Sequence, residues 1–262
     1  MSDGTKKTQL AIVTGASAGI GAAMAKQLAA REYRVLAVAR RADRLAALEA
    51  ASGGAIVALS QDLTVDGAVE RVAARAAELG GADLLVNNAG FGSFGPFWTC
   101  SRQTITNMLR LNVLTGVELA HHVLPGMIQR KRGGVIIVTS SAGMYPTPNL
   151  AAYGGSKAFL LLWGEALAIE LRGTGVRALV VCPGPTATEF GEVAGMSEML
   201  EKAPGIMQPE AVAKAVLQAW DRGRVLTVPG ASNWLMSAIF QRLPRGVTRS
   251  LAASLFKGPA KS

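Results

Sequence analysis

The sequence is poor in the residue types that build disulfide frameworks and metal sites. Only two of its 262 residues are cysteines, Cys100 and Cys182, and their separation fits neither a disulfide scaffold nor a metal site. Its two histidines, His121 and His122, are neighbours. Adjacent residues on a helix point about 100° apart, which disfavours a shared metal ion or a catalytic triad. These shortages predict a reducing, cytoplasmic setting and no bound metal.

Charge and long apolar runs are also scarce. Two long uncharged stretches, 84–101 and 133–156, are interrupted by Gly, Pro, Asn and Ser, so neither is predicted to span a membrane. Only 17% of residues are charged, and the net charge is +9. A basic chain favours anionic partners such as phosphate cofactors, acidic carrier proteins or lipid surfaces. Scattered arginines without a zinc-finger or RNA-binding pattern argue against nucleic acid.

Short apolar runs alternate with Ala-rich helical segments along the whole chain. The predicted strands are 10–14, 34–39, 56–60, 84–87, 135–140, 176–182 and 225–228. The predicted helices are 21–31, 43–51, 65–79, 104–130, 151–172 and 209–222. Continuous apolar runs are typical of strands buried on both faces, and this alternation predicts a doubly wound parallel sheet of about seven strands, with helices on both faces. A single Rossmann-type domain, 1–262, with a flexible start at 1–8, is the economical interpretation.

The helix predicted over 151–172 has more apolar surface than one sheet can cover. Between Ala158 and Leu171 its only charged residues are Glu165 and Glu170. A helix that packs on a sheet needs one apolar stripe. The surplus predicts a homo-oligomer, a dimer or tetramer, built through the helices 104–130 and 151–172.

A glycine-rich turn follows the first predicted strand, with Gly15, Gly19 and Gly21 in a G-x-x-x-G-x-G spacing. Glycines let the backbone approach a diphosphate, and the N-terminus of the following helix offers free N–H groups. The second strand ends in Arg40-Arg41, where an acid would favour NAD. Guanidinium groups suit a 2′-phosphate, so the pair favours NADP over the alternative of a solvated basic turn. 

Asp62, after the third strand, is as consistent with an adenine contact as with a hydrogen-bonded turn. Asn87-Asn88-Ala89-Gly90 ends the fourth strand. Small residues and amides at that place fit the ligand crevice of an open sheet.

Tyr153 and Lys157 lie four positions apart in the helix predicted over 151–172, so they share one helix face. Tyrosine titrates near ~10 and is a weak acid–base group at neutral pH. A neighbouring ammonium is expected to lower that pKa, and a serine hydroxyl from Ser140-Ser141 to orient a substrate oxygen. A surface helix pair is the usual alternative for such spacing.

Taken together, these motifs resemble the short-chain dehydrogenase/reductase family, in its compact form of about 250 residues. The glycine turn resembles TGxxxGIG, residues 87–90 resemble NNAG, and Tyr153 with Lys157 resembles YxxxK. The resemblance implies four catalytic residues: Asn112, Ser140, Tyr153 and Lys157. It also implies, together with the motifs above, a set of NADP-binding residues: Gly15, Ser17, Ala18, Gly19, Ile20, Gly21, Arg40, Arg41, Asp62, Leu63, Asn88, Ala89, Gly90, Tyr153, Lys157, Pro183, Gly184, Thr186 and Thr188.

The implied activity is hydride transfer between NADP(H) and a carbonyl or alcohol carbon of an apolar substrate, of ketone or 3-oxoacyl type. Tyr153 is expected to act as general acid/base, Ser140 to bind the substrate oxygen and Lys157 to bind the nicotinamide ribose. Asn112 is expected to anchor a water of the proton relay. The alternatives are a catalytically silent NADP-binding module, which has no need of all four residues, and an epimerase or dehydratase, which usually carries a larger substrate region.

Two segments are expected to contact the substrate. The first, 189–205 with the nearby Met207, is a candidate lid in which Phe190, Met196, Met199 and Leu200 are apolar, although ordinary helix packing is as consistent with it. Phe91, Phe94, Phe97, Met144 and Tyr145 are candidates to extend the apolar wall. The second segment, 230–262, is basic and amphipathic; a lid or oligomer contact is favoured there over a membrane surface. Arg130-Lys131-Arg132 is a solvated loop or a docking point for an acidic acyl carrier.

Overall fold

The predicted strands are present in the computed structural model, which describes residues 8–201 and 203–256. They are β1 (Leu10–Thr14), β2 (Arg34–Ala39), β3 (Ile56–Ser60), β4 (Ala82–Asn87), β5 (Gly133–Val138), β6 (Val176–Val181) and β7 (Leu226–Thr227). Every residue of β1 and β4 is buried, as the continuous apolar runs predicted.

The seven strands form one parallel sheet in the order β3-β2-β1-β4-β5-β6-β7. The chain builds outward from β1 to β3, returns to the middle, and builds outward again from β4 to β7. The order therefore reverses between β1 and β4, and ligands of open α/β sheets bind at the carboxyl ends of the strands at such a point. Thr14 and Asn87 end these two strands, so the glycine turn and residues 87–90 meet there. The predicted doubly wound fold is confirmed.

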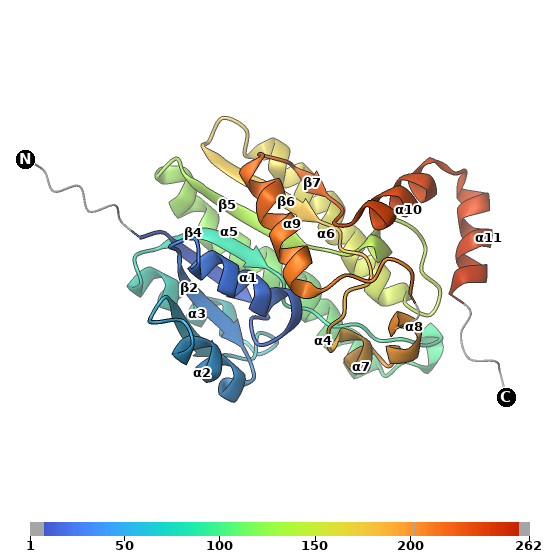
Figure 1. Cartoon of the computed structure of the whole chain (residues 1–262), viewed down its shortest axis with the longest axis horizontal. Helices are drawn as coiled ribbons and strands as arrows, with labels where there is room; N and C mark the ends of the chain where they lie inside the picture. Colours follow the sequence, from blue (N-terminus) through green and yellow to red (C-terminus); the bar gives the residue numbers. More distant parts are fainter. Residues whose placement is uncertain (1–7, 202, 257–262) are drawn as a thin grey trace, which may run out of the picture.

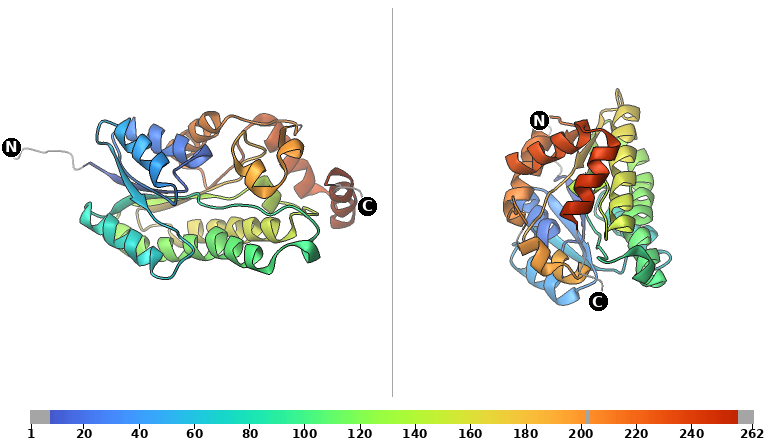
Figure 2. Two further views of the ribbon diagram at one scale, coloured as in Figure 1. Left: turned by 90° about the horizontal axis from the view of Figure 1, so that it is seen from below. Right: turned by 90° about the vertical axis from the view of Figure 1, so that its right-hand side faces the viewer.

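Helices cover both faces of the sheet (Figure 2). On one face, α1 (Gly19–Ala29), α2 (Ala42–Ala50) and α9 (Pro209–Asp221) pack on the strands through side chains such as Met24, Leu45 and Val216. On the other face, α3 (Ala68–Glu78), α5 (Thr115–Gln129) and α6 (Ala151–Glu170) do the same through Val72, Leu119 and Leu160. Burying one apolar stripe of each helix on each face produces two cores separated by the sheet.

The structure corrects one predicted helix. The segment expected as a single helix over 104–130 is divided into α4 (Arg102–Leu109), a π-helical turn over Arg110–Leu114, and α5. Apolar periodicity does not reveal such a turn, because the wider turn is stabilised by tertiary contacts of Asn112 rather than by its own sequence. The helix expected from Val65 begins at Ala68, because Gly67 has a φ of +73°.

The remaining helices gather beyond the carboxyl ends of the strands. They are the short turns Phe97–Thr99 and Ser141–Gly143, then α7 (Phe190–Ala194), α8 (Ser197–Glu201), α10 (Ala231–Arg242) and α11 (Arg245–Leu255). In Figure 1, α10 and α11 project from the side of the molecule opposite the N-terminal strand. Among the described residues, no helix is long and apolar enough to cross a bilayer.

Candidate functional site

The turn between β1 and α1 requires glycine at three positions. Gly15 and Gly19 have φ values of +69° and +54°, which favour glycine. A Cβ on Gly21 would lie 2.3 Å from the Gly15 carbonyl oxygen, so that position admits no side chain. Ala18, at the N-cap of α1, makes no side-chain hydrogen bond with the helix, and the first turn holds no acid. This turn has the shape and the polarity of a cradle for an anionic group.

A second segment closes over the glycine turn. A Cβ on Gly19 would lie 2.9 Å from the Thr188 methyl, so the segment after Pro183-Gly184 lies directly beside the turn. Thr186 forms an isolated parallel bridge with Met207, and its hydroxyl donates to the Gly184 carbonyl at 3.0 Å. The structure therefore brings the residues predicted from the first and sixth strand ends together.

Basic residues lie where β2 ends, in an arrangement that the sequence predicted only in part. The Arg41 side chain donates to Ser17 Oγ at 3.1 Å and to Glu189 at 2.6 Å. Arg44, on α2, pairs with the other oxygen of Glu189. The two arginines hold the pKa of the Glu189 carboxyl below its usual range. Arg40, which the sequence paired with Arg41, is exposed and does not join this ion pair.

Arg44 and Glu189 were missed at the sequence level. Arg44 lies one helical turn after Arg41, so the spacing predicts that the two side chains are neighbours. The approach of Glu189, 148 residues later than Arg41, depends on the tertiary fold. The result is a carboxylate held by two guanidinium groups and a nearby hydroxyl, which is the arrangement that a phosphate oxygen also accepts.

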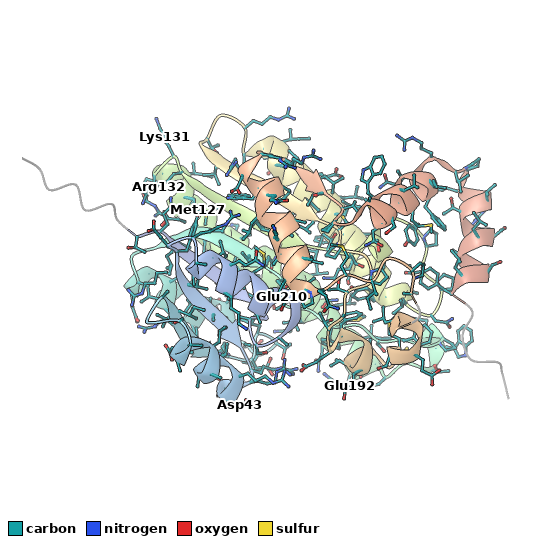
Figure 3. The ribbon with its side chains drawn as sticks, in the orientation of Figure 1. Asp43, Met127, Lys131, Arg132, Glu192 and Glu210 are labelled. Carbon is teal, nitrogen blue, oxygen red and sulfur yellow. The ribbon has the colours of Figure 1, made fainter. Side chains whose placement is uncertain are left out.

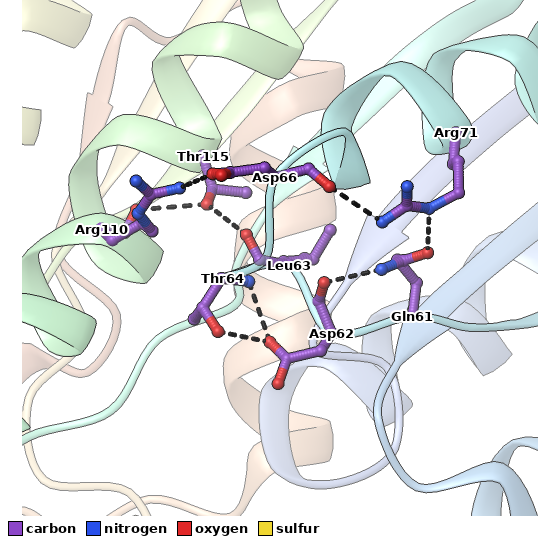
Figure 4. A network of polar contacts seen from close by, with 8 residues as sticks. All are labelled: Gln61, Asp62, Leu63, Thr64, Asp66, Arg71, Arg110 and Thr115. Atoms are coloured by element: carbon purple, nitrogen blue, oxygen red, sulfur yellow. Dashed lines mark hydrogen bonds and ion pairs between the residues drawn. The ribbon is translucent and has the colours of Figure 1, made fainter.

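Asp62 belongs to a polar network after β3 (Figure 4). Its carboxylate accepts from the Thr64 amide at 2.8 Å and the Thr64 hydroxyl at 2.7 Å. Burial raises the pKa of Asp62, but these bonds and the charge of Arg40 outweigh it, so the pKa is lowered. The Leu63 carbonyl accepts from Thr115 Oγ1 at 2.9 Å, which ties this loop to α5. The hydrogen-bonded turn is present, and the adenine contact stays a prediction.

Residues 87–90 are fixed against β1. The Thr14 hydroxyl accepts from the amides of Asn88 and Ala89 at 2.9 and 3.0 Å, and the Asn88 side chain donates to the Thr14 carbonyl at 2.8 Å. These bonds hold the end of β4 against the start of the glycine turn. A Cβ on Gly90 would approach Asn112 Oδ1 to 2.8 Å and Lys157 Nζ to 3.4 Å, so only glycine fits there.

Ser140, Tyr153 and Lys157 meet where β5 ends and α6 begins. The Ser140 hydroxyl caps the following turn by accepting from the Ala142 amide at 3.1 Å, and it forms a side-chain hydrogen bond with Tyr153. Lys157 Nζ donates to the Val138 carbonyl at 3.1 Å and lies 5.8 Å from the centre of the Tyr153 ring. The predicted trio is therefore assembled in space.

Burial dominates the titration of this group. It raises the pKa of Tyr153 to about 12, while the hydrogen bond with Ser140 opposes the rise. It lowers the pKa of Lys157 to about 8. The sequence predicted that Lys157 lowers the Tyr153 pKa, and the polypeptide on its own shows the opposite direction. The reason is that both side chains are removed from water, and desolvation disfavours the charged form of each.

Asn112 connects the π-helical turn to the end of β4 and to α6. Its side-chain oxygen accepts from the Phe91 amide at 3.0 Å, and its side-chain nitrogen donates to the Phe91 carbonyl at 3.0 Å and to Ser156 Oγ at 3.1 Å. Ser156 in turn donates to the Tyr153 carbonyl at 2.6 Å. Asn112 is thus a structural link between Gly90–Phe91 and the helix that carries Tyr153 and Lys157. Sequence reasoning did not identify Ser156.

Tyr153 belongs to an apolar cluster. Its buried members are Met108, Leu150, Tyr153, Ala194 and Met196. Its partly buried members are Phe91, Phe94, Ala142, Ala152, Phe190, Leu200 and Phe256. The Phe190 and Tyr153 rings lie 5.2 Å apart. Five predicted lining residues therefore belong to the same cluster as Tyr153: Phe91, Phe94, Phe190, Met196 and Leu200.

Other predicted lining residues lie elsewhere. Phe97 is 56% exposed, Met144 packs with Leu161 and Val180, and Met207 packs against the core under α1 and α9. The side chain of Met199 lies outside the described residues. Apolar composition alone does not distinguish Phe97, Met144 and Met207 from the residues in the cluster with Tyr153. The path of the loops decides which apolar side chains join that cluster.

The C-terminal helices close one side of the cluster. The Tyr145 ring stacks on Phe240 of α10 with centroids 4.5 Å apart. The Asn149 side chain donates to the Phe256 carbonyl at 2.9 Å, which ties the end of α11 to the loop before α6. Residues 257–262, the end of the predicted C-terminal segment, lie outside the described part of the chain, as do residues 1–7.

Two other predicted features lie away from this site. Lys131 and Arg132 are at the opposite end of the sheet from α7 and Glu192 (Figure 3), and Arg132 pairs with Asp83 at 3.2 Å. The His121 and His122 rings are 6.5 Å apart and edge-on. Within residues 8–201 and 203–256, no group of His, Cys, Asp and Glu is arranged to hold a metal ion.

Comparison with known proteins places the chain among close relatives. Residues 9–198 match the family described as short chain dehydrogenase. The chain is 40% identical over 184 residues to an uncharacterized oxidoreductase of Myxococcus xanthus, covering 69% of this chain and 73% of the relative. It is 35% identical over 220 residues to the ketoacyl reductase HetN of a Nostoc species, covering 82% and 75%.

A solved structure extends the likeness to nearly the whole chain. The short-chain dehydrogenase from Sphingobium yanoikuyae, solved in complex with NADPH, superimposes with a TM-score of 0.82 at 30% identity, covering 97% of this chain and 98% of that one. The shared architecture therefore includes the C-terminal helices as well as the sheet.

Proposed function

The chain belongs to the short chain dehydrogenase family and is an oxidoreductase, and on that premise we propose that it transfers hydride between NADP(H) and the carbonyl or alcohol carbon of an apolar substrate. The observation that carries this proposal is the meeting of Ser140, Tyr153 and Lys157 beside an apolar cluster, next to the glycine turn. A proton donor, a hydroxyl that binds its oxygen and an ammonium are the groups that carbonyl reduction needs.

The residues around the glycine turn fit a dinucleotide. The space over Gly15 and Gly21 admits no side chain, and the N-terminus of α1 offers its N–H groups to a diphosphate. Ser17 and Arg41, with the newly found Arg44, suit the 2′-phosphate that distinguishes NADP from NAD. The NADPH-bound relative from Sphingobium yanoikuyae supports this preference. We assign the remaining predicted binding residues to the same cofactor.

The cofactor, when bound, supplies or accepts the hydride. For reduction, the neutral Tyr153 phenol donates its proton to the carbonyl oxygen. The pKa of about 12 keeps that phenol protonated at neutral pH, so it starts as an acid. The Ser140 hydroxyl holds the substrate oxygen beside the phenol. The resulting phenolate is stabilised by the Lys157 ammonium. The free-energy cost of burying that ammonium is smallest when an opposite charge, here the phenolate, lies in the same buried site.

Lys157 and Asn112 take supporting roles in this proposal. We assign Lys157 two roles, binding of the nicotinamide ribose and stabilisation of the phenolate. Asn112 uses both amide atoms on Phe91, so we assign it a positioning role, in which it holds Gly90 and Phe91 beside Lys157. Its expected contact with a relay water stays a prediction.

We propose a ketone or a 3-oxoacyl compound as the substrate, with segment 189–205 as its lid. The apolar side chains around Tyr153 favour a greasy substrate, and Phe190 and Leu200 bring α7 and α8 onto it. HetN, a relative at 35% identity, is named as a ketoacyl reductase. The ion pairs of Glu189 with Arg41 and Arg44 join the start of this lid to the cofactor side of the site.

We also propose that the chain forms a homo-oligomer through α5 and α6. On α6 the exposed positions Gly155, Phe159, Leu162, Ala166 and Ile169 recur every three or four residues and form one stripe. The same spacing is found at exposed positions of α5, Glu118, His121, Pro125 and Ile128, and at Leu114 directly before it. Spacing of this kind is the pattern of helix–helix packing, and the exposed Phe159, Leu162 and Ile169 make the stripe on α6 contiguous and apolar.

A substrate panel tests the proposal. NADPH oxidation is followed with aromatic ketones, diketones, steroids and 3-oxoacyl thioesters, with NADH in parallel. The proposal expects turnover with NADPH well above that with NADH on at least one class. Binding of NADPH without turnover on any class would favour a silent NADP-binding module instead.

A further inference from the structure

The charge of the chain is concentrated at its C-terminal end. Residues 222–262 contain seven of the 27 Lys and Arg residues and none of the 18 Asp and Glu residues. The preceding 221 residues are therefore nearly balanced, with 20 basic and 18 acidic residues. The helices α10 and α11 lie in this basic region, and they project from the body of the molecule (Figure 1).

The outward side of α10 is apolar where a solvent-facing helix side is normally polar. Its inward side is defined by Asn233, Ser237 and Phe240, which are buried. The Asn233 side chain donates to the carbonyls of Gly205 and Pro229 at 3.1 and 3.2 Å, which fixes the rotation of the helix. The large apolar residues on its other sides are all exposed, at 57%, 54%, 43% and 47%, and they are Trp234, Leu235, Met236 and Ile239.

The next helix, α11, continues the same surface with one apolar stripe and one basic stripe. Val247, Leu251 and Leu255 recur every four residues and are 45%, 42% and 60% exposed. Arg245 and Arg249 form the second stripe, on the other side of the buried Thr248 and Ala252. Arg242 ends α10 in the same region. We call the exposed apolar residues and arginines of α10 and α11 together the C-terminal surface.

We propose that the C-terminal surface docks the enzyme on an anionic lipid bilayer. The charge complementarity is with the lipid headgroups, because no acidic residue follows Asp221. The exposed Trp234, Leu235 and Ile239 match the apolar layer beneath those headgroups, where amphipathic basic helices lie in the plane of the interface. A bilayer offers anionic headgroups to the arginines and an apolar layer to the apolar side chains along both helices.

A second copy of the chain is a poorer match. A two-fold contact brings the same surface of both copies together, so Arg242, Arg245 and Arg249 would face their own copies without a carboxylate on α10 or α11. An acidic protein would satisfy the arginines but leaves the row of Leu, Met and Ile on α10 in need of an apolar partner. The labelled acidic residue of α7, Glu192, lies well away from α10 in Figure 3.

Docking in this way places the catalytic end of the sheet at the membrane. The inward side of α10 stacks on Tyr145, and the end of α11 packs against the cluster around Tyr153. If the proposed function holds, an apolar substrate passes to Tyr153 along the inner side of these helices. The docking itself does not depend on that function.

Vesicle co-sedimentation of the full chain tests the proposal. Vesicles of phosphatidylcholine with about 30% phosphatidylglycerol are compared with pure phosphatidylcholine at low salt. The variant Arg242→Gln/Arg245→Gln/Arg249→Gln is expected to lose on the order of a hundred-fold in partitioning, because each basic residue near an anionic surface contributes about a five-fold factor. High salt is expected to weaken the binding of the wild type to the anionic vesicles, because it screens the same charges.

A matched variant separates the surface from net charge alone. Arg34→Gln/Arg102→Gln/Arg172→Gln removes the same charge from exposed sites outside the C-terminal surface and is expected to sediment like the wild type. Circular dichroism of each variant checks that the fold is retained. Because sedimentation does not read turnover, it separates failure of the docking from failure of the proposed chemistry.

Four results would overturn the proposal. The first is no sedimentation of the wild type with the anionic vesicles. The second is equal loss in both arginine variants. The third is a change of oligomeric state in Trp234→Ser/Ile239→Ser by light scattering, which would assign the surface to a second copy. The fourth is binding to an immobilised acidic acyl carrier protein by a chain that ignores the vesicles.

Discussion

The buried Lys157 predicts that the stability of the cofactor-free chain depends on pH in a defined direction. Its ammonium has the Val138 carbonyl at 3.1 Å, and burial lowers its pKa from an ordinary 10.5 to about 8. A lowered lysine pKa means that the unfolded chain holds more protons than the folded chain between pH 8 and 10.5. Stability from this group therefore rises with pH through that window.

The expected size follows from the two pKa values. At about pH 7.5 the charged lysine costs the folded state on the order of 3 kcal/mol, and at about pH 9.5 roughly half of that. Wild type is therefore expected to gain about 2 kcal/mol relative to Lys157→Met between these two pH values. The difference between the two proteins removes the titration of Tyr153, whose raised pKa makes stability fall as pH rises through the alkaline range.

Urea unfolding of both proteins at several pH values gives this difference directly. Methionine is close to lysine in length and carries no charge. Any packing change in Lys157→Met therefore alters the free energy of unfolding equally at all pH values. If the two stability curves run parallel from about pH 7.5 to 9.5, Lys157 is not desolvated as the structure indicates, and its assignment as a buried partner of the phenol is wrong.

Three further predictions concern the proposed cofactor site and the proposed oligomer. Arg41→Gln and Arg44→Gln are each expected to raise the KM for NADPH roughly 10- to 100-fold in steady-state assays, and to leave the KM for NADH unchanged, since a charged hydrogen bond contributes about 1.5–3 kcal/mol. Gly21→Ala is expected to destabilise the fold by about 1–3 kcal/mol in thermal unfolding and to abolish NADP+ binding, because its Cβ would lie 2.3 Å from a backbone oxygen of the same turn. Gly246→Ala, whose Cβ meets nothing within 4 Å, is the control and should lose nothing. Leu162→Asp is expected to reduce the mass measured by light scattering while the circular dichroism spectrum is retained; an unchanged mass would remove α6 from the interface.

Much of the fold was predictable because it depends on local apolar patterns. The runs 10–14 and 34–39 became strands with those bounds, since a strand buried on both faces needs an unbroken apolar stretch. The Tyr153 and Lys157 pair was predictable for a related reason: a spacing of four on a helix fixes two side chains on one face. Both inferences depend on geometry within one element.

What was missed depends on contacts between elements. Glu189 meets Arg41 from a loop 148 residues away, and no local pattern encodes that approach. The side chain of Asn112, in the π-helical turn, bonds to Phe91, which follows a different strand, and no local pattern encodes that contact. The direction of the Tyr153 pKa was also beyond the sequence, because it depends on how deeply the phenol is buried rather than on its spacing from Lys157.

The most direct test of the proposed chemistry is the variant Tyr153→Phe, assayed with NADPH and the ketone or thioester that the wild type reduces fastest. The ring keeps its contact with Phe190, while the acidic proton is removed. NADPH affinity, measured by fluorescence titration, is expected to stay within about two-fold of wild type, and kcat to fall by roughly 100- to 10,000-fold. Turnover within about ten-fold of wild type, at unchanged NADPH affinity, would show that Tyr153 does not supply the proton.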